Sequence, residues 1–246
     1  MKLTPVKRFF IVMIPFAVLG AAFKVMTLVE GLTEIRPANA IPIIAGLLCG
    51  PMGALGCAAG NLVADVFGSL GWQSILGVIG NFLAAFLPWR LWYLYRAEQP
   101  NVHSYKNLAL YAWLSLISAL TVAWFLSFGL ELFFGLWIES IYRYVLYNNF
   151  AFSLGLGLPI FIVLTSDSVQ IEPSEKPKSM GLKITSRPWL MKTLVLAYTL
   201  LMILLLVGVF LGKHLKNSGS MVLLSIASVF LLIGLCMLPV GEEEGT

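Results

Sequence analysis

Amide and carboxylate side chains recur at helical spacing within a stretch of the chain that is otherwise apolar and rich in glycine. Asn61 and Asp65 are four residues apart, and Gln73, Gly77 and Asn81 repeat the same spacing, so each set shares one helical face. Side chains of this kind donate and accept hydrogen bonds, and Asp65 adds a charge. The two sets could hold a small polar molecule, with space for it beside the glycine.

The composition of the chain indicates which elements must position these side chains. The 246 residues are 59% hydrophobic and 11% charged, with a mean hydropathy of +0.89. Apolar runs of about 20 residues recur along the chain, which is the length that a helix needs to cross a bilayer. The sequence therefore predicts an all-α fold, a polytopic integral membrane helical bundle whose solvent is lipid.

Membrane spans are predicted in six clear stretches and in one ambiguous region. The clear spans lie near residues 9–29, 74–95, 108–133, 144–164, 190–212 and 221–240. Residues 39–68 contain the turn signal Gly50-Pro51, so this region is either one span with a loop or two short helices folded back on each other. The first span also has features of a secretory signal, but its apolar length favours an uncleaved helix.

The distribution of basic residues favours the folded-back pair. Lys and Arg accumulate in cytoplasmic loops, and here they cluster in the N-terminal segment, in residues 96–107 and in residues 165–189. These segments lie on one side of the membrane only if an even number of spans separates each from the next, which two short helices at Gly50-Pro51 provide. Both termini are then cytoplasmic. The loop at 213–220, with two lysines, is the single discordant segment.

Three parts of the chain are expected from these features. Residues 1–164 form a six-helix membrane domain, and residues 165–189 form a cytoplasmic linker rich in Ser, Pro, Lys and Glu. Residues 190–246 form a two-helix transmembrane hairpin with a short acidic tail. The hairpin spans hold almost no polar residue, so we expect them to pack against the domain or to anchor the chain.

Polar residues inside a membrane are costly unless they are paired or face a cavity, and here they gather at the outer ends of the third to sixth helices. The candidate substrate-binding residues are Asp65, Asn81 and Asn149, followed by Gln73, Trp72, Asn61 and Arg36. Simpler roles stay open for several polar residues. Asn61 could join two helices by a hydrogen bond, Asp65 could cap a short turn, and Glu139 with Arg143 could form a surface ion pair.

Other classes of function find no support in the sequence. No nucleotide-binding loop, catalytic motif or Cys-His metal cluster is present, so we expect no enzyme activity, no metal and no cofactor. The net charge of +4 comes from scattered Lys and Arg, which argues against a nucleic-acid partner. A small-residue pair, Ala17 and Ala21, lies on an otherwise bulky helix and is a candidate for docking a partner protein.

A resemblance to a known family lies in the segment EIRPANAIPIIAGLLCGPMGALGCAAGNLVADVFGSLGWQSILGVIGNF. This segment resembles the substrate-specific S component of energy-coupling factor (ECF) transporters. The likeness rests on the short helix that begins at Ile41-Pro42, the Gly50-Pro51 turn, the glycine-rich helix that ends in Asp65, and Gly80-Asn81-Phe82. With the six-helix count it covers about the first two thirds of the chain. The hairpin after residue 189 departs from the family pattern.

The resemblance implies the substrate-binding subunit of an ABC uptake transporter for a small solute, a vitamin or its precursor, in the plasma membrane of a prokaryote. The implied partners are a coupling transmembrane subunit, on which Ala17 and Ala21 would dock, and two ATPase subunits. The alternative is a membrane sensor or anchor that binds a ligand or a partner without transport. A third class, an intramembrane lipid-modifying enzyme, would need a motif-spaced pair of catalytic groups, which the sequence lacks.

Overall fold

The computed structural model describes residues 3–24, 26–30, 33–68, 70–167, 169, 171, 173–174, 176–177 and 188–237. These residues are helical apart from one two-stranded ribbon and the connecting loops. Seven helices among them are long and apolar enough to cross a membrane, which is the structure of a multi-pass membrane protein. Most of the predicted linker and all of the predicted acidic tail lie outside the described residues.

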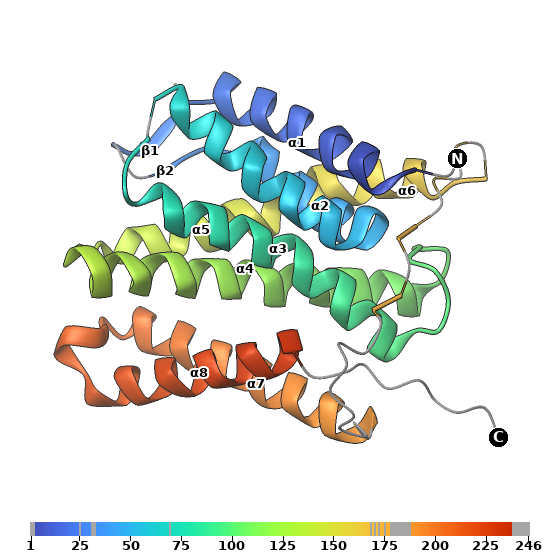
Figure 1. Cartoon of the computed structure of the whole chain (residues 1–246). Helices are drawn as coiled ribbons and strands as arrows, with labels where there is room; N and C mark the ends of the chain where they lie inside the picture. The colour runs from blue at the N-terminus through green and yellow to red at the C-terminus, as the bar shows by residue number, and fades with distance from the viewer. Residues whose placement is uncertain are drawn as a thin grey trace.

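The elements follow in a simple order along the chain. They are α1 (Pro5–Ala22), β1 (Thr27–Val29), β2 (Thr33–Glu34), η1 (Pro37–Ala40), α2 (Ile41–Val66), α3 (Ser74–Tyr95), α4 (Tyr105–Phe134), α5 (Glu139–Phe152), the π-helical turn η2 (Ser153–Gly157), α6 (Leu158–Leu164), α7 (Pro188–Phe210), η3 (Leu215–Asn217) and α8 (Gly219–Met237). The segment from α5 to α6 forms one long helix through η2. In Figure 1, α1 and α2 lie on one side of α3 and α4, and the α7–α8 pair lies on the other.

N-cap hydroxyl groups and a C-terminal glycine determine several of the helix ends. The Thr4 hydroxyl accepts from the amide of Lys7 and starts α1, and the Ser104 hydroxyl accepts from the amide of Asn107 and starts α4. The long helix α4 ends at Gly135, which has a φ of 68° in the left-handed region that glycine adopts readily. The spans predicted at 74–95 and 108–133 are confirmed as α3 and α4.

The first helix is shorter than the sequence predicted. α1 ends at Ala22, and the expected extension of this helix to Val29 is wrong, because residues 27–29 pair with residues 33–34 as an antiparallel ribbon. The β-branched residues Thr27, Val29 and Thr33 favour an extended backbone over a helix. The ribbon places Glu34 and the residues that follow it beside the end of α1, where the candidate site lies.

A sharp break divides α2 at the position that the sequence indicated. Gly50 has φ 59° and ψ −141°, which is outside the helical region, and Pro51 follows it. A Cβ atom added to Gly53 would lie 2.3 Å from the carbonyl oxygen of Ala45. Residues eight apart in a straight helix are about 12 Å apart, so the second part of α2 must turn back along the first. The predicted interruption at Gly50-Pro51 is confirmed.

Arg8 stabilises this break from the neighbouring helix. The turn at Gly50 removes the helical partners of the carbonyl groups just before it. The Arg8 guanidinium donates to the carbonyl oxygen of Leu48 at 2.5 Å, and the amide of Ser174 donates to the same oxygen at 2.9 Å. A cation at the C-terminal end of a helix also interacts favourably with the helix dipole. The break is therefore held by contacts from α1 and from the segment after α6.

Small residues allow the first three helices to pack at close range. Gly56 and Gly60 of α2 lie against the carbonyl oxygens of Phe9 and Met13 in α1, and Gly46 lies against the carbonyl oxygen of Ala85 in α3. A Cβ at Gly46 would be only 1.9 Å from that oxygen. Close backbone approach of this kind is how helices associate in membranes. Internal packing thus accounts for these glycines.

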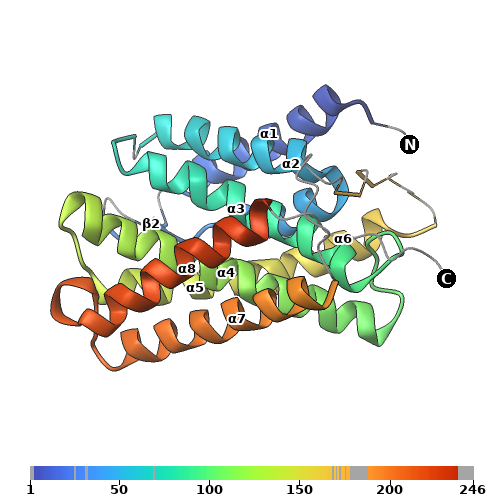
Figure 2. The ribbon, with the colours of Figure 1, turned by 60° about the horizontal axis from the view of Figure 1, so that its bottom comes forward.

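The hairpin of α7 and α8 is fastened to the rest of the bundle by buried polar contacts. Figures 1 and 2 show the two helices side by side along α4. Near the middle of the bundle, the Tyr198 hydroxyl lies 3.0 Å from the Thr121 hydroxyl, and the Trp124 indole donates to the Ser225 hydroxyl. The expectation that the hairpin packs is confirmed, although its spans contribute more polar contacts than the sequence indicated.

Both ends of the hairpin are also held by charged side chains. The buried Glu131 carboxylate at the end of α4 accepts from the amides of Leu215 and Lys216, at 2.9 and 2.8 Å, and contacts the His214 ring. At the opposite end, the Arg90 guanidinium of α3 donates to the carbonyl oxygen of Leu235 at 2.9 Å, in the last turn of α8. The hairpin is consequently fixed along its length.

Candidate functional site

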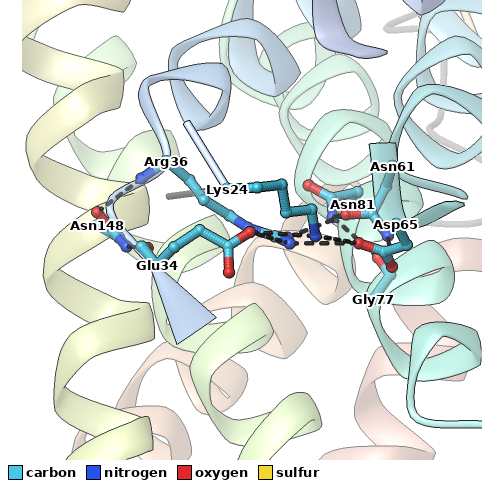
Figure 3. Close-up of polar contacts among 8 residues, drawn as sticks. All are labelled: Lys24, Glu34, Arg36, Asn61, Asp65, Gly77, Asn81 and Asn148. Atoms are coloured by element: carbon cyan, nitrogen blue, oxygen red, sulfur yellow. Dashed lines mark hydrogen bonds and ion pairs between the residues drawn. The ribbon is translucent and has the colours of Figure 1, made fainter. Parts of the chain in front are cut away.

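Four charged side chains meet between the end of α1, the ribbon and α2. The Lys24 ammonium lies 2.9 Å from Asp65 Oδ1 and 3.3 Å from Glu34 Oε1. The Arg36 guanidinium lies 2.6 Å from the same Glu34 oxygen and 3.4 Å from Asp65 Oδ1. We call these four residues the charged cluster, which Figure 3 shows as alternating cations and carboxylates. Its formal charges cancel.

Amide side chains extend this cluster across two further helices. Asn61 donates to Asp65 Oδ2 at 3.1 Å along one face of α2, as its spacing predicted. The Asn61 amide oxygen accepts from Arg36 and from Asn81 of α3, both at 3.1 Å. Asn148 of α5 donates to the backbone oxygen of Glu34 at 2.6 Å. The network shown in Figure 3 therefore ties α2, α3 and α5 to the ribbon.

The network is buried, so its ion pairs matter for the stability of the fold. Asp65 and Glu34 expose only 4% and 6% of their surfaces, and Asn61 exposes 1%. Moving a charge out of water costs several kcal/mol, on the order of the attraction that an opposite charge returns in a low-dielectric interior. Each carboxylate here has two cations within 3.4 Å, which offsets that cost. Loss of one charge would leave the remainder unbalanced.

A cavity of about 80 Å³ adjoins the network. Its polar wall carries Arg36, Asn39, Asp65, Gln73, Asn81, Asn148 and Asn149, and its apolar wall carries Val122, Leu126, Leu130, Ile141 and Val145. Small-molecule sites commonly combine an apolar wall with a few convergent polar groups. This cavity has that composition, and all seven of these polar residues are amides or carry a charge, so they can both orient and recognise a ligand by hydrogen bonds.

Most of the residues predicted for binding are brought together here. Asp65, Asn81, Asn149, Gln73 and Arg36 line the cavity. Asn61 lies immediately behind them, where its bond to Asn81 joins α2 to α3, so the simpler role weighed for this residue is confirmed.

Trp72 lies elsewhere. It is 78% exposed and does not line the cavity. Trp137 stacks on the His214 ring at 5.1 Å between centroids. Glu139 and Arg143 form the ordinary ion pair on the α5 surface that their spacing indicated. The aromatic residues at this end of the bundle thus serve the surface and the hairpin contact.

Two members of the charged cluster were not candidates from the sequence. Lys24 falls inside the apolar stretch assigned to the first span, where a lone cation is itself a signal of function or pairing. Glu34 lies five residues beyond the predicted end of that span, where the sequence offers no neighbour at helical spacing to suggest a partner. Their ion pairs form because α1 ends at Ala22 and the ribbon turns the chain back toward it. The run of apolar residues up to Val29 instead predicts a helix that continues, so these pairs could not be predicted from the sequence.

The described residues contain no group of three or more His, Cys, Asp or Glu side chains placed to hold a metal ion. The chemistry available in the network is hydrogen bonding and ion pairing. In the comparisons with known proteins, no family model, curated protein or solved structure matches the chain.

Proposed function

We propose that the chain is the solute-binding membrane subunit of an uptake transporter of the ECF type, energised by separate ATPase subunits. The observation that carries this proposal is the convergence of buried polar side chains from α2, α3, α5 and the ribbon on one cavity. Ionisable groups inside a membrane are expensive and mark pathways or binding sites for polar solutes. The sequence resemblance to S components supports the same function.

The chemistry of the cavity favours a small solute that both donates and accepts hydrogen bonds. At about 80 Å³ the cavity must widen to enclose a vitamin or its precursor, because sites for such molecules have volumes of about 300 Å³ or more. Amides at Asn81, Asn148 and Asn149 offer both kinds of group, while Arg36 and Asp65 offer opposite charges. The apolar wall formed by α4 and α5 would take the less polar face of such a solute. No catalytic step is needed for this role.

The proposed topology has six crossings before the linker and two in the hairpin. The reversal of α2 at Gly50 supports two short crossings in this helix, and the basic segments then lie on one side. With both termini in the cytoplasm of a prokaryotic cell, the charged cluster lies toward the outer face of the plasma membrane. The cavity would thus receive solute from outside.

Small molecules that copurify with the protein in mild detergent test the binding function. Asn81→Ala should lower the amount of bound compound per protein by about tenfold, because each lost hydrogen bond of a polar ligand is worth about 1 kcal/mol and the Asn61 contact is lost with it. Mass spectrometry of the extracted compounds measures this ratio. Gln99→Ala, which truncates an exposed amide, is the matched control. Equal ligand content in the two variants would remove the site assignment.

Assembly with a coupling subunit tests the transport function separately. Ile14, Ala17, Val18 and Ala21 lie on one face of α1, and the two alanines are half-buried between exposed neighbours. Ala17→Leu combined with Ala21→Leu should reduce copurification of a coexpressed coupling subunit at least tenfold, since bulky side chains prevent close helix approach. Ala151→Leu, at an exposed site on α5, should not. Undiminished assembly of the double variant would refute docking through this face, and a protein that binds solute without any coupling subunit would be a sensor.

A further inference from the structure

An apolar groove runs between α4 and α8, on the side of the bundle away from the charged cluster. It has a volume of about 550 Å³. Its walls are made by aromatic and branched side chains, chiefly Trp124, Phe125, Phe128, Val222, Ile226 and Val229. Leu132 and Phe133 at its outer end are exposed, as are Ile226 and Val229 along its edge, so the groove opens sideways from the bundle. In a membrane that opening faces lipid.

The length of the groove matches one leaflet of a bilayer. The α4 residues that line it extend from Trp124 to Phe133, a rise of about 13 Å along the helix. Half of a hydrocarbon core is about 15 Å thick. The bond from the Trp124 indole to the Ser225 hydroxyl uses the polar atoms of those two side chains, leaving their apolar surface to line the groove. An extended hydrocarbon chain fits this shape and polarity.

A cation stands at the outer end of the groove. Lys216 of η3 lines it, and its ammonium lies 3.5 Å from the position that a Cβ on Gly135 would take. The nearest buried carboxylate, Glu131, is occupied by His214 and two backbone amides. Lys213 and Lys216 are both exposed, and within the part of the chain that the structure describes neither forms an ion pair with a carboxylate.

These two lysines also form the one loop whose charge conflicts with the proposed topology. Basic residues accumulate on the cytoplasmic side, yet this loop is at the outer end of the hairpin, opposite the basic segments. A lysine near a membrane surface gains about 1 kcal/mol from anionic lipid. Attraction to a lipid phosphate accounts for the two lysines in this loop.

We propose that the groove between α4 and α8 binds one acyl chain of an anionic phospholipid of the outer leaflet, with the lipid phosphate at Lys216 and Lys213. The chain lies against Phe125, Phe128 and Val229, and the headgroup lies at the level of η3. The lipid would fill the space between α4 and α8 and would add to the contacts that hold the hairpin. This site is separate from the cavity beside Asp65; its place in the outer leaflet rests on the proposed topology, but lipid binding does not depend on the uptake function.

Native mass spectrometry of the full chain in mild detergent tests the site with dioleoyl phosphatidylglycerol and dioleoyl phosphatidylcholine as probes. The wild type should hold phosphatidylglycerol in preference to phosphatidylcholine. Lys213→Gln with Lys216→Gln should weaken phosphatidylglycerol binding by about 25-fold, which is about fivefold for each lysine at about 1 kcal/mol. Val229→Trp, which fills the groove, should weaken binding of both lipids at least tenfold.

Matched variants away from the groove serve as controls. Lys106→Gln removes an exposed lysine at the opposite end of α4, and Val163→Trp enlarges an exposed residue of α6, and neither should change lipid binding. The lysine variants alter only exposed side chains, so they test the headgroup contact even if Val229→Trp fails to fold. Unchanged phosphatidylglycerol binding in the lysine variants would overturn the proposal. Displacement of the lipid by inorganic phosphate at millimolar concentration would overturn it as well, because the site would then recognise a free anion.

Discussion

Asp65→Ala is expected to lower the free energy of unfolding by about 3–5 kcal/mol, because it removes a buried carboxylate that lies within 3.4 Å of both the Lys24 ammonium and the Arg36 guanidinium. The same change removes a hydrogen-bond acceptor from Asn61. Chemical denaturation in detergent micelles, followed by circular dichroism, measures the loss. Bound small molecules should be lost with it.

Two further variants separate charge imbalance from the loss of a side chain. Glu139→Ala breaks a carboxylate–arginine pair on the α5 surface, where such pairs contribute about 0.3–0.5 kcal/mol, so its effect should be small. Adding Lys24→Ala to Asp65→Ala restores the balance of the charged cluster, and the double variant should be no less stable than Asp65→Ala alone. A loss below about 1 kcal/mol for Asp65→Ala would show that the cluster is hydrated and not buried.

Gly50→Ala is expected to cost about 3 kcal/mol or more, the second large effect. The backbone of Gly50 lies near a region that only glycine occupies readily, which alone costs an L-residue about 1–3 kcal/mol. The added methyl would also lie 2.2 Å from the Ser174 hydroxyl and 3.1 Å from the Trp89 indole nitrogen. Thermal unfolding in detergent measures the loss of stability. Limited proteolysis of the folded protein would show a changed cleavage pattern near residue 50 if α2 straightens.

Gly212→Ala is the control for the backbone contribution. Gly212 also has a positive φ, 70°, but nothing lies within 4 Å of the position of its Cβ. Its substitution should cost about 1–2 kcal/mol, the ordinary penalty for a left-handed residue. Equal costs at the two positions would mean that the close contacts at Gly50 relax freely and that the break in α2 is not tightly held.

Hydropathy and local chemistry predicted the helices well, because both depend on nearby residues. The span predicted at 74–95 has the bounds of α3, and the Gly50-Pro51 signal marks a real break. The end of α1 was missed because residues 23–29 are apolar apart from Lys24 and Thr27, and hydropathy does not distinguish a helix from an extended segment of the same composition.

Only the part of the candidate site that depends on spacing within one helix could be predicted from the sequence. Helical spacing identified Asn61 with Asp65 and placed Asn81 on the facing helix, but the ion pair of Lys24 with Asp65 joins residues 41 positions apart. Pairing over that distance depends on how separate elements pack against each other. The spacing of residues within one helix carries no information about that packing. The contact of Glu131 with the amides of Leu215 and Lys216 was hidden in the same way.

The cancellation of charge within the cluster has an electrical consequence. A membrane potential does work on any net charge that moves through it, about 2.3 kcal/mol per elementary charge for each 100 mV. Two cations and two carboxylates that move together by the same distance carry no net charge, so the field does no net work on that joint movement. In the proposed uptake function, the field would then act on the charge of the solute and not on a joint movement of these four side chains.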